Sequence, residues 1–573
     1  MVFTHNNSTF LVLLLLLVLF AASIATPLDD YILKEDSNYR WYDTGGRLKG
    51  RFLTGGWEGV VLNMTSQGWL SPMHVDCFLW THNLVILKPH KVMHPRTSFL
   101  LIGQGSNTNN PPKATDQLLL LAAALAVRTN TIAAVLYQVP NQPCGFSDDE
   151  WHPRSEDDII AYTWAHFIRN PEEVEWPLHI PMTKAAVRAM DTLQTYACKH
   201  LKIQIESFVV AGASKRGWTT WLTAAVDKRV VGIAPIVMDA LRFVDNLHHY
   251  YKSFGGWPWS FEPYQSLNLT TNLDSPEFSA LMGIEDPYVY LPRLTMPKLI
   301  VTSSNDEFFL LDDSSYFWSE MIGEKHLLIL SNTDHSLLTG LPKLLAAMEA
   351  FVLSIVLDYE KDNPMMGTQP NIQSQQKKGF SSMFFSLFQA LELQDLLNVA
   401  THISKFFLSQ CLIESLHDKL GTSNGWKNGR PNFWWTIDWR KGRLEILSKE
   451  MPSKSILWYA YTNSGNNRRD FRWVAADLGN CSTFTVGGKC FQPIFFHHQH
   501  IQPVMFKVTS EGNLKYVATI TFPKEGYGAF FVELRFKGPQ ATMPFIFTTE
   551  AVIVPNTFPF PDCHGTGCTG TLV

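Results

Sequence analysis

Between residues 98 and 331, short apolar segments alternate with helix-like segments, and this alternation constrains the fold more than any other feature. Each apolar segment has four to seven residues, lacks clear polar–apolar alternation and ends in polar residues or glycine. Such segments are typical of strands buried on both faces of a sheet. The expected strands are 99–102, 131–136, 208–211, 230–236, 298–302 and 326–330, and the expected helices are 116–128, 183–200, 218–226, 314–322 and 337–357. The sequence therefore predicts an α/β fold with a mostly parallel sheet and helices on both faces, led by antiparallel strands at 57–62 and 81–87.

The character of the sequence changes after Asp358. Residues 361–378 are rich in Pro, Gln and Asn and indicate a linker, whereas residues 380–420 are strongly apolar with helical spacing. We expect a helical hairpin packed on the main body there; a lid over a substrate pocket, or a surface for a membrane or a partner, are the alternatives. From residue 432, aromatic and β-branched segments separated by turn residues predict an antiparallel β-sandwich. The predicted organisation is a signal peptide (1–25), an α/β domain (26–360), a linker with an amphipathic helical insertion (361–430) and a β-sandwich domain with a C-terminal tail (431–573).

The N-terminus has the pattern of a secretion signal. Residues 10–22 form a leucine-rich apolar run, and small residues from Ser23 to Ala25 follow it at the spacing of a cleavage site. No Lys or Arg precedes the run, so a retained anchor is the alternative, but the run is short for a membrane span. We therefore expect a secreted, extracellular protein without a stable membrane span. The glycosylation candidates in Asn-x-Ser/Thr triplets are Asn63, Asn268 and Asn480.

Composition and cysteine spacing narrow the class of protein. The chain is 46% hydrophobic and 17% charged, as folded globular proteins are, and its net charge of −5 without a long basic run gives no indication of a nucleic-acid partner. The eight cysteines form an even set, with Cys198 and Cys411 in helix-like apolar patterns typical of buried thiols. No Cys or His array has zinc-binding spacing, so we predict neither a metal nor another cofactor. The disulfide candidates are Cys481 with Cys490, and Cys563 with Cys568.

The sequence Gly212-Ala-Ser-Lys-Arg-Gly217 joins a predicted strand to a predicted helix. A strand, a glycine-flanked serine and a helix are the layout of a nucleophile elbow, which exposes a serine hydroxyl at the carboxyl edge of a parallel sheet. The turn needs small neighbours because the serine takes a positive φ and the helix packs close to the strand. Arg216 departs from the usual Gly-x-Ser-x-Gly pattern, since it occupies the small-residue position and the second glycine follows one place later. An ordinary βα turn rich in Gly and Ser is the structural alternative.

An acid and a histidine follow Ser214 in the chain order of α/β-hydrolase triads. Asp306 follows the strand at 298–302, and His335 follows the strand at 326–330. His335 would accept the serine proton and later protonate the leaving group, while Asp306 would orient the imidazole. The alternatives are Asp239 as the acid, Asp334, which is more natural as a turn residue, and His248 and His249, which are more typical of solvated or capping histidines.

Backbone and charged groups near Ser214 suit the stabilisation of an anion. An oxyanion hole needs two N–H groups, which we expect from Lys215 and from the loop Gly103-Gln104-Gly105. An ordinary glycine turn is the alternative for that loop. Lys215 and Arg216 also place two cations beside the serine, and one of them could stabilise the oxyanion or a substrate carboxylate. A surface pair pointing away from the pocket is equally compatible with the sequence.

Several longer motifs resemble the PhoPQ-activated pathogenicity-related protein family, which includes secreted autocrine proliferation repressors. They are Tyr137-Gln-Val-Pro-Asn-Gln-Pro143, Gly212-Ala-Ser-Lys-Arg-Gly-Trp218, Asn305-Asp-Glu-Phe-Phe309, Asn332-Thr-Asp-His-Ser-Leu337, and the closing Phe547-Thr-Thr-Glu550 with Val554-Pro-Asn-Thr-Phe-Pro-Phe560. The similarity covers about Thr26 to Phe560, and the segment near 361–430 is longer than expected for the family. The resemblance implies an α/β-hydrolase-like domain followed by a β domain, with Ser214, Asp306 and His335 in the triad positions.

Two functions remain open from the sequence. The first is a secreted serine hydrolase, an esterase or peptidase, that acts on a small-molecule ester or a peptide through an acyl-enzyme on Ser214. The second is a secreted signalling protein that represses proliferation by binding a cell-surface receptor or another protein, with catalysis absent or incidental. The Ser-x-x-Gly elbow is also similar to that of glucuronoyl esterases, which makes an ester of an acidic substrate worth testing.

Overall fold

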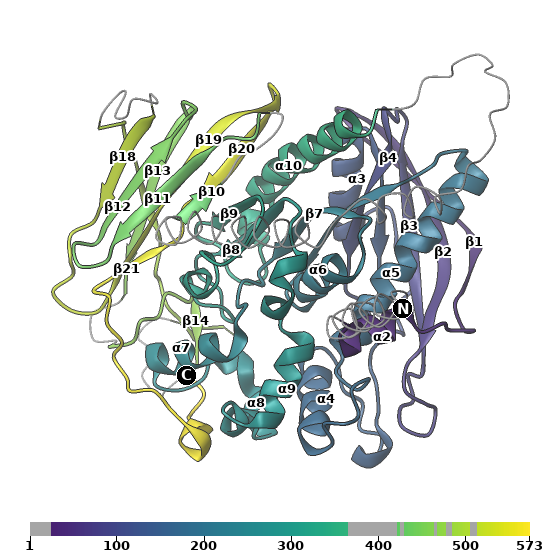
Figure 1. The fold of residues 1–573 in the computed structure, drawn as a ribbon, viewed down its shortest axis with the longest axis horizontal. Helices are drawn as coiled ribbons and strands as arrows, with labels where there is room; N and C mark the ends of the chain where they lie inside the picture. The colour runs from purple at the N-terminus through teal and green to yellow at the C-terminus, as the bar shows by residue number, and fades with distance from the viewer. Residues whose placement is uncertain are drawn as a thin grey trace, which may run out of the picture.

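The computed structural model describes residues 25–364, 421–423, 429–462, 467–476, 484–486, 488–504 and 513–573. One long mixed sheet runs through the molecule (Figure 1). Its first three strands are antiparallel: β1 (Arg40–Phe52), β2 (Gly55–Gly68) and β3 (Leu79–Pro89). The strands that follow are parallel to one another and lie in the order β5 (Thr131–Leu136), β4 (His94–Ile102), β6 (Ser207–Ala213), β7 (Val230–Ile236), β8 (Lys298–Ser303) and β9 (Lys325–Leu330).

The parallel strands form the core of the molecule. β5, β8 and β9 are buried along their whole length. This burial explains why their sequences read as continuous apolar runs rather than as alternating patterns. In the sheet, β5 lies next to β3 and β4 lies next to β6, so the spatial order of β4 and β5 is the reverse of their order along the chain. This reversal of strand order lies next to β6. Polar groups after strand ends near such a reversal face a crevice at the carboxyl edge of the sheet.

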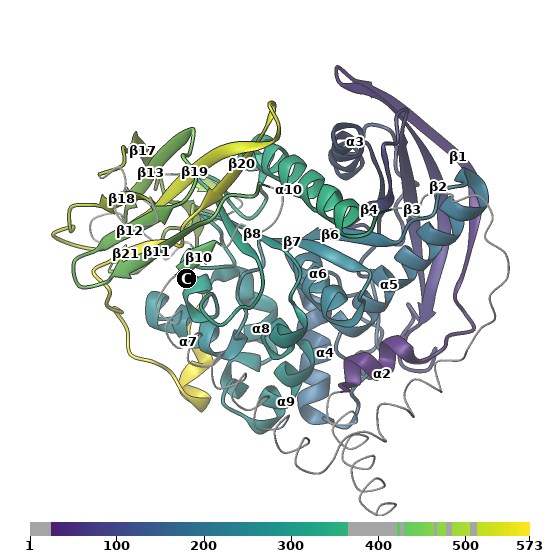
Figure 2. The ribbon, with the colours of Figure 1, turned by 45° about the horizontal axis from the view of Figure 1, so that its top comes forward.

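Helices cover both faces of this sheet. In Figure 2, α3 and α10 lie on one side of the sheet, and α5 and α6 lie on the other. The helices are α2 (Pro27–Leu33), α3 (Gln117–Thr129), α4 (Asp157–Arg169), α5 (His179–Tyr196), α6 (Lys215–Val226), α7 (Phe243–Phe254), α8 (Glu262–Ser266), α9 (Pro276–Glu285) and α10 (Leu341–Asp362). The predicted α/β architecture of a mostly parallel sheet between two helical layers is confirmed.

One predicted helix is wrong. Residues 314–322 form a short 3-10 helix (Asp313–Tyr316) and turns, with bonds such as Phe317 N–H to the Ser314 carbonyl. Phe317 and Trp318 are neighbours in sequence, and both are buried. A regular surface helix would turn neighbouring side chains about 100° apart, so this segment gives up the α-helix to bury both rings. The predicted helical insertion at 380–420 lies outside the described residues, as does the predicted signal peptide up to residue 24.

The C-terminal strands continue the central sheet instead of starting a separate one. β20 (Met543–Thr548) pairs with β9 at Thr548 and Leu327, and Thr548 Oγ1 accepts from the Ile329 N–H at 3.0 Å. Beyond β20 the sheet adds β19 (Gly528–Gln540), β13 (Lys454–Tyr461) and β17 (His497–His500), and β21 (Val552–Val554) pairs with β19. The parallel core and the antiparallel C-terminal layer therefore share one hydrogen-bonded sheet.

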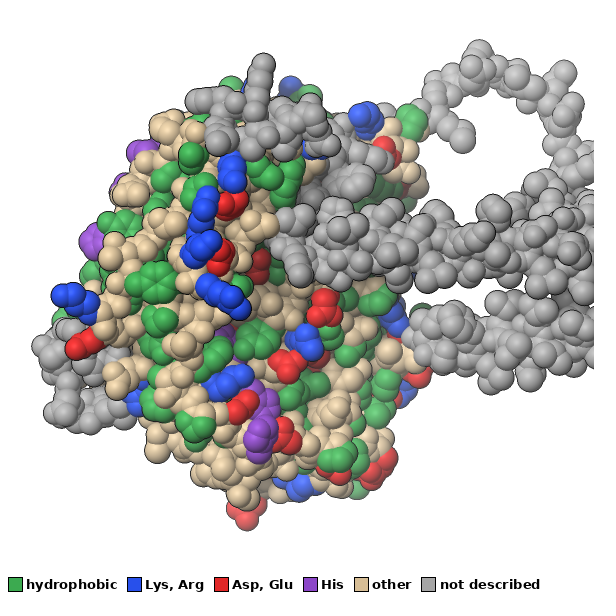
Figure 3. Space-filling model, turned by 60° about the vertical axis from the view of Figure 1, so that its left-hand side comes forward, with side chains coloured by type: hydrophobic (Ala, Val, Ile, Leu, Met, Phe, Trp, Pro, Cys, Tyr) green, Lys and Arg blue, Asp and Glu red, His purple; other side chains and the backbone are tan. Residues whose placement is uncertain are grey.

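A second antiparallel sheet completes the sandwich. It contains β10 (Gly421–Ser423), β11 (Phe433–Asp438), β12 (Arg443–Ser448) and β18 (Leu514–Thr519). The ring of Phe433 stacks on Phe536 of β19 at 5.7 Å, so the two layers meet through aromatic side chains. A smaller sheet joins β14 (Val474–Ala475), β16 (Lys489–Phe491) and β15 (Thr485–Val486). Figure 3 shows that the face carrying the C-terminal strands mixes side chains of both charges with apolar ones.

α10 is the one helix among the described residues that is long and apolar enough to cross a membrane. Within Leu338–Asp362, the most apolar 18-residue window has a mean hydropathy of 1.8, but 67% of that window is buried inside the protein. Its buried residues, from Leu344 to Val356, face the sheet and α3. These contacts are those of a core helix in a large α/β domain.

Candidate active site

The turn between β6 and α6 has the geometry of a nucleophile elbow. Ser214 adopts φ 58° and ψ −128°, a backbone conformation that side chains rarely take. Both glycines of the motif are required by close packing. A side chain at Gly212 would collide with the backbone of Arg216, and one at Gly217 would lie 2.9 Å from the Ile236 carbonyl oxygen at the end of β7. Gly217, although it comes one place later than in the usual motif, therefore has the same function as the usual second glycine: it lets α6 pack against β7.

Ser214, His335 and Asp306 meet at the carboxyl edge of the sheet. Ser214 Oγ lies 3.0 Å from His335 Nε2, and His335 Nδ1 lies 2.9 Å from both carboxylate oxygens of Asp306. Ser214 follows β6, Asp306 follows β8 and His335 follows β9. The three residues that the sequence singled out from distant segments thus form one continuous chain of contacts.

The loop around Asp306 fixes the position of its carboxylate. Oδ1 accepts the backbone N–H groups of Phe308 at 2.7 Å and Phe309 at 3.1 Å, and Oδ2 accepts the Ser303 hydroxyl at 3.0 Å. The side chain is fully buried. With His335 Nδ1, four hydrogen-bonding groups surround this buried carboxylate and leave it a single orientation toward the imidazole.

The His335 imidazole and the neighbouring Glu307 carboxyl have shifted pKa values. Burial disfavours a charged imidazole, but the neighbouring Asp306 carboxylate outweighs burial and raises the pKa of His335. Burial, followed by the negative charge of Asp306, raises the pKa of Glu307 to about 7. The Glu307 carboxylate accepts the His335 backbone N–H at 3.1 Å, and the Phe308 ring packs 4.4 Å from the imidazole. Shifted pKa values of neighbouring groups are typical of functional sites.

Sequence comparison places the chain in a family. A family model described as PhoPQ-activated pathogenicity-related protein matches residues 28–382. The chain is also 32% identical to autocrine proliferation repressor protein A of Dictyostelium discoideum over 567 residues, which are 96% of this chain and 95% of that protein. The chain belongs to the PhoPQ-activated pathogenicity-related protein family.

Solved structures similar to this PhoPQ-related protein include esterases. An acetyl xylan esterase from Paenibacillus sp. R4 is 12% identical with a TM-score of 0.37, and covers 56% of this chain and 97% of its own. A glucuronoyl esterase from Solibacter usitatus is 13% identical with a TM-score of 0.32, and covers 54% of this chain and 86% of its own. The strand order and the elbow, rather than these distant likenesses, define the hydrolase-like fold of the PhoPQ-related chain.

Lys215 and Arg216 of the PhoPQ-related protein are buried and held by carboxylates. The Arg216 guanidinium binds both oxygens of Glu156 at 2.7 and 2.8 Å, and its Nε donates to the Val139 carbonyl at 2.5 Å. Lys215 Nζ lies 2.8 Å from Glu156 and 2.9 Å from Asp157. The pair does not point out at the surface, and its positive charge is already balanced inside the protein. Glu156 was not identified from the sequence, because nothing in its surroundings marks it as the partner of residues sixty positions away.

The sequence predicts that the loop after β4 supplies an N–H group to an oxyanion hole. Gly103 is excluded as a donor, since its N–H is given to the Leu136 carbonyl at 2.7 Å. Gln104 is exposed, and Gly105 has φ 152° with the Gln138 backbone close by. The N–H groups of Gln104 and Gly105 are therefore the remaining candidate donors of this loop, and the N–H of Lys215, at the start of α6, is the candidate from the elbow.

The other acids and histidines considered from the sequence have different surroundings. Asp239 is fully buried and has no hydrogen-bond partner among the described residues, and burial followed by the charges of Asp313 and Asp306 raises its pKa well above the usual range. Asp334 accepts the Ser336 hydroxyl at 2.6 Å, as a turn residue does. His249 is buried in α7 with Nδ1 3.2 Å from Asp313. None of these residues has a described contact with Ser214.

Two hollows are lined in part by Glu156, the ion-pair partner of Lys215 and Arg216. The first, here called the aromatic groove, has a volume of about 630 Å³ and is lined by Glu156, Asp158, Trp259, Phe308 and Lys489, among others. The second, here called the polar groove, has a volume of about 430 Å³ and is lined by Gln104, Gly105, Tyr137, Gln142 and Glu156, among others. Glu156 borders both, and Phe308 connects the aromatic groove to the imidazole.

The cysteines and glycosylation candidates are also located. Disulfides join Cys563 to Cys568 and Cys77 to Cys144; the second pair was not recognised, because 67 residues separate its members. Cys198 is free and exposed instead of buried, Cys490 is disulfide-bonded, and Cys411 and Cys481 lie outside the described residues. Asn268 is exposed in a turn, whereas Asn63 is half-buried within β2 and Asn480 lies outside the described residues.

Proposed function

We propose that this protein is a secreted serine hydrolase of the esterase type, with Ser214 as nucleophile, His335 as general base and Asp306 as the orienting acid. The observation that carries the proposal is the contact chain from Ser214 Oγ through His335 to Asp306, built on an elbow at the carboxyl edge of the sheet. A binding scaffold has no physical need for this combination of a strained serine, a buried carboxylate and an imidazole oriented between them.

The reaction follows from the geometry. Ser214 Oγ attacks an ester carbonyl while His335 Nε2 takes its proton, and the resulting oxyanion is held by the N–H groups of Lys215 and of Gln104 or Gly105. Collapse expels the alcohol, which receives the proton from His335, and leaves an acyl-serine. Water then attacks the acyl group with the same imidazole as base, releasing the acid and restoring Ser214. A peptide bond could be cleaved by the same steps, with an amine as leaving group.

The buried ion pairs bear on the choice of substrate. Lys215 and Arg216 are both engaged by Glu156, which supports a preference for neutral esters over esters of acidic substrates. Comparing kcat/KM for matched neutral and carboxylate-bearing esters tests this point. A strong preference for the anionic ester would mean that one of the cations is free to bind substrate.

Labelling with a fluorophosphonate probe tests the proposed nucleophile. We expect the purified protein to be labelled on Ser214, and labelling to be lost in Ser214→Ala and in His335→Ala. Ser266→Ala is a matched control, since Ser266 lies on the surface and its hydroxyl bonds only to the nearby Pro263 carbonyl among the described residues. Labelling that persists in Ser214→Ala, in a folded protein, would exclude Ser214 as the nucleophile.

A second candidate function is a signal that represses proliferation through a receptor. It is favoured by the 32% identity to autocrine proliferation repressor protein A over almost the whole chain. Secretion is common to both functions, and the disulfides support it because such bonds persist in oxidising compartments. If Ser214→Ala retains antiproliferative activity on cultured cells, signalling is independent of catalysis; loss of activity in a folded variant would tie the two together.

A further inference from the structure

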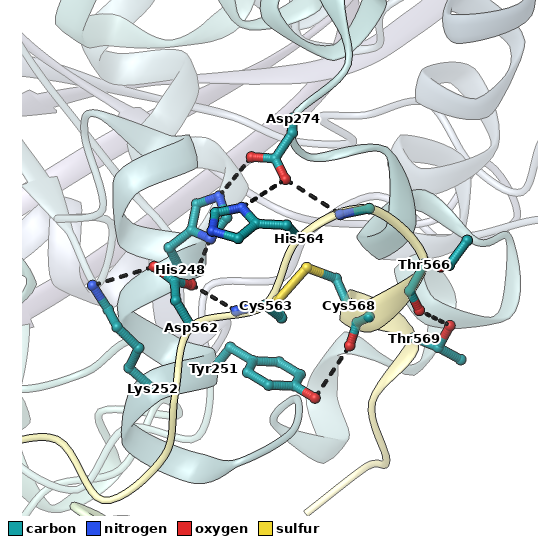
Figure 4. Close-up of a disulfide and its surroundings, with 12 residues drawn as sticks. His248, Tyr251, Lys252, Asp274, Asp562, Cys563, His564, Thr566, Cys568 and Thr569 are labelled. Carbon is teal, nitrogen blue, oxygen red and sulfur yellow. Dashed lines mark hydrogen bonds and ion pairs between the residues drawn. A yellow bond between two sulfur atoms is a disulfide. The ribbon is translucent and has the colours of Figure 1, made fainter.

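Two histidines and an aspartate converge where the C-terminal tail crosses the α/β domain. His248 belongs to α7, Asp274 lies in the loop before α9, and His564 precedes the 3-10 helix Gly565–Thr569 of the tail (Figure 4). His248 Nε2 lies 3.1 Å from Asp274 Oδ1, and His564 Nδ1 lies 3.0 Å from Asp274 Oδ2. We propose that these three side chains form a zinc site that fastens the tail to the domain.

The position of His248 between two carboxylates is the first argument. Its Nδ1 lies 2.8 Å from Asp562 Oδ1, and its Nε2 lies 3.1 Å from Asp274 Oδ1. An imidazole nitrogen and a carboxylate oxygen both have lone pairs that a cation accepts, so a cation between His248 Nε2 and Asp274 would bind to both. Asp562 then fulfils the role of the carboxylate that orients a metal-binding histidine from behind.

The spacing and chemistry of the donor atoms are the second argument. One ligand atom from each of the three residues lies within 4.8 Å of the others. Ligands about 2.0–2.1 Å from a tetrahedral zinc ion are separated by about 3.3 Å. Each imidazole lies close to that distance from one oxygen of Asp274, His248 from Oδ1 and His564 from Oδ2. Two imidazoles and one carboxylate are a donor set that zinc accepts, with the fourth position left to water. Cys563 does not contribute, because its sulfur is bonded to Cys568.

The surroundings support the arrangement of the ligands. The disulfide between Cys563 and Cys568 closes a short loop that begins next to His564. The Gly565 N–H donates to Asp274 Oδ2 at 3.3 Å, and the Cys563 N–H donates to Asp562 Oδ1 at 2.8 Å. Both carboxylates are thus oriented by the tail itself. The tail then continues to Leu572, which lines the aromatic groove, so the site would hold one wall of that groove in place.

Zinc binding to the full-length protein tests the proposal. β17 carries His497, His498 and His500, all exposed, and these could bind zinc on their own. The experiment therefore uses a background in which these three histidines are replaced by Gln, after treatment with a chelator. We expect one equivalent of zinc by mass spectrometry and by competition with a chromogenic chelator. Absence of stoichiometric binding in this background would overturn the proposal.

Variants of the ligands locate the binding. His564 has a side chain that is 71% exposed, so His564→Gln is expected to fold and to lose stoichiometric binding. Asp562→Asn should weaken binding about ten-fold or more, because it removes the group that orients His248. His152→Gln, at an exposed histidine, should leave affinity unchanged. Equal affinity in His564→Gln and the background would refute the site.

Stability and exchange provide a readout that does not depend on catalysis. At a zinc concentration about a hundred times Kd, we expect the Tm to rise by about 2 °C in the background and not in His564→Gln. Hydrogen exchange over residues 560–573 should slow on addition of zinc. If two protonated histidines alone hold Asp274, zinc will change neither quantity, and the proposal fails.

Discussion

Replacement of Glu156 by Gln tests the idea that one carboxylate holds the elbow in place. Glu156 pairs with the Arg216 guanidinium through both oxygens and with Lys215 through one. Lys215 and Arg216 directly follow Ser214 in the sequence. Lys215 and Arg216 are almost fully buried, with side chains 7% and 6% exposed. The substitution therefore leaves two buried cations with less than their balancing charge.

The cost can be estimated from the burial of each partner. Removing one partner of a fully buried pair costs about 3–5 kcal/mol. Glu156 itself is 37% exposed, and water will screen part of the remaining charge, so we expect a loss of about 2–3 kcal/mol in the free energy of unfolding. Residue 156 has a φ of 54°, and both the wild type and Glu156→Gln carry a side chain there, so the backbone strain is the same in both. The difference in the free energy of unfolding therefore measures the effect of the charge.

The pH dependence of this loss has a definite sign. Burial opposes ionisation of Glu156, but the charges of Arg216 and Lys215 outweigh it and hold its pKa well below the usual range. A carboxyl with a lowered folded pKa contributes stability above its unfolded pKa of about 4, and that contribution is lost as the pH falls through the folded value. Wild type and variant should therefore differ fully at neutral pH and converge only in strong acid.

Urea unfolding at pH 7 and at several acidic values measures the effect. Glu150→Gln is a matched control, because Glu150 is exposed and also has a positive φ of 51°. The substrate preference should shift as well: with an effective dielectric of about 20, a unit charge at about 8 Å is worth about 2 kcal/mol, or up to thirty-fold in kcat/KM in favour of an anionic ester. Equal stabilities and unchanged preference in Glu156→Gln would refute the role assigned to this residue.

Three further predictions concern the triad, the elbow and the disulfides. Asp306→Asn should lower kcat by about 10³–10⁴-fold with little loss of stability, because the amide favours the wrong imidazole tautomer, and pre-steady-state kinetics would detect the change in the chemical step. Activity should fall at acidic pH as His335 becomes protonated. Asp306 raises the pKa of His335 against the effect of burial, so the acidic limb of the pH–activity profile should move to lower pH in Asp306→Asn. A limb that does not move would assign the acidic limb to another group. Gly217→Ala should destabilise by about 1–3 kcal/mol in thermal unfolding, since its methyl group would lie 2.9 Å from both the Ile236 oxygen and Met238 Cβ; a neutral result would mean that α6 can move. Loss of the Cys77–Cys144 bond in Cys144→Ser should cost about 4 kcal/mol, against about 2 kcal/mol for Cys563→Ser, because the loop closed is far longer, and denaturant midpoints would rank the two.

The sequence was sufficient for the parallel core and for the residues at its carboxyl edge. Strands such as 131–136 and 230–236 are continuous apolar runs. A strand that is buried on both faces requires apolar side chains at nearly every position, so its sequence is easily recognised. Ser214, Asp306 and His335 could be located because each lies in the turn or loop that follows such a strand. The apolar run that identifies each strand therefore also locates the polar residue that follows it at the edge of the sheet.

Features that depend on contacts between distant segments could not be predicted. The pairing of Glu156 with Arg216, the Cys77–Cys144 bond and the convergence of His248 with His564 have no common local pattern. The segment 314–322 was misread for a related reason: its apolar spacing fits a helix, but tertiary burial of Phe317 and Trp318 decides its conformation. The continuation of the central sheet through β20 is likewise a matter of which strands meet, which strand propensity does not encode.

The pairing of β20 with β9 has a practical consequence for dissecting the protein. A fragment that stops after α10 would expose the outer side of β9, whose residues from Lys325 to Leu330 are all buried in the intact chain. An apolar strand with unpaired amides is a template for self-association. We therefore expect the isolated N-terminal half to aggregate on expression, whereas the full chain, with that strand covered, unfolds as one cooperative body.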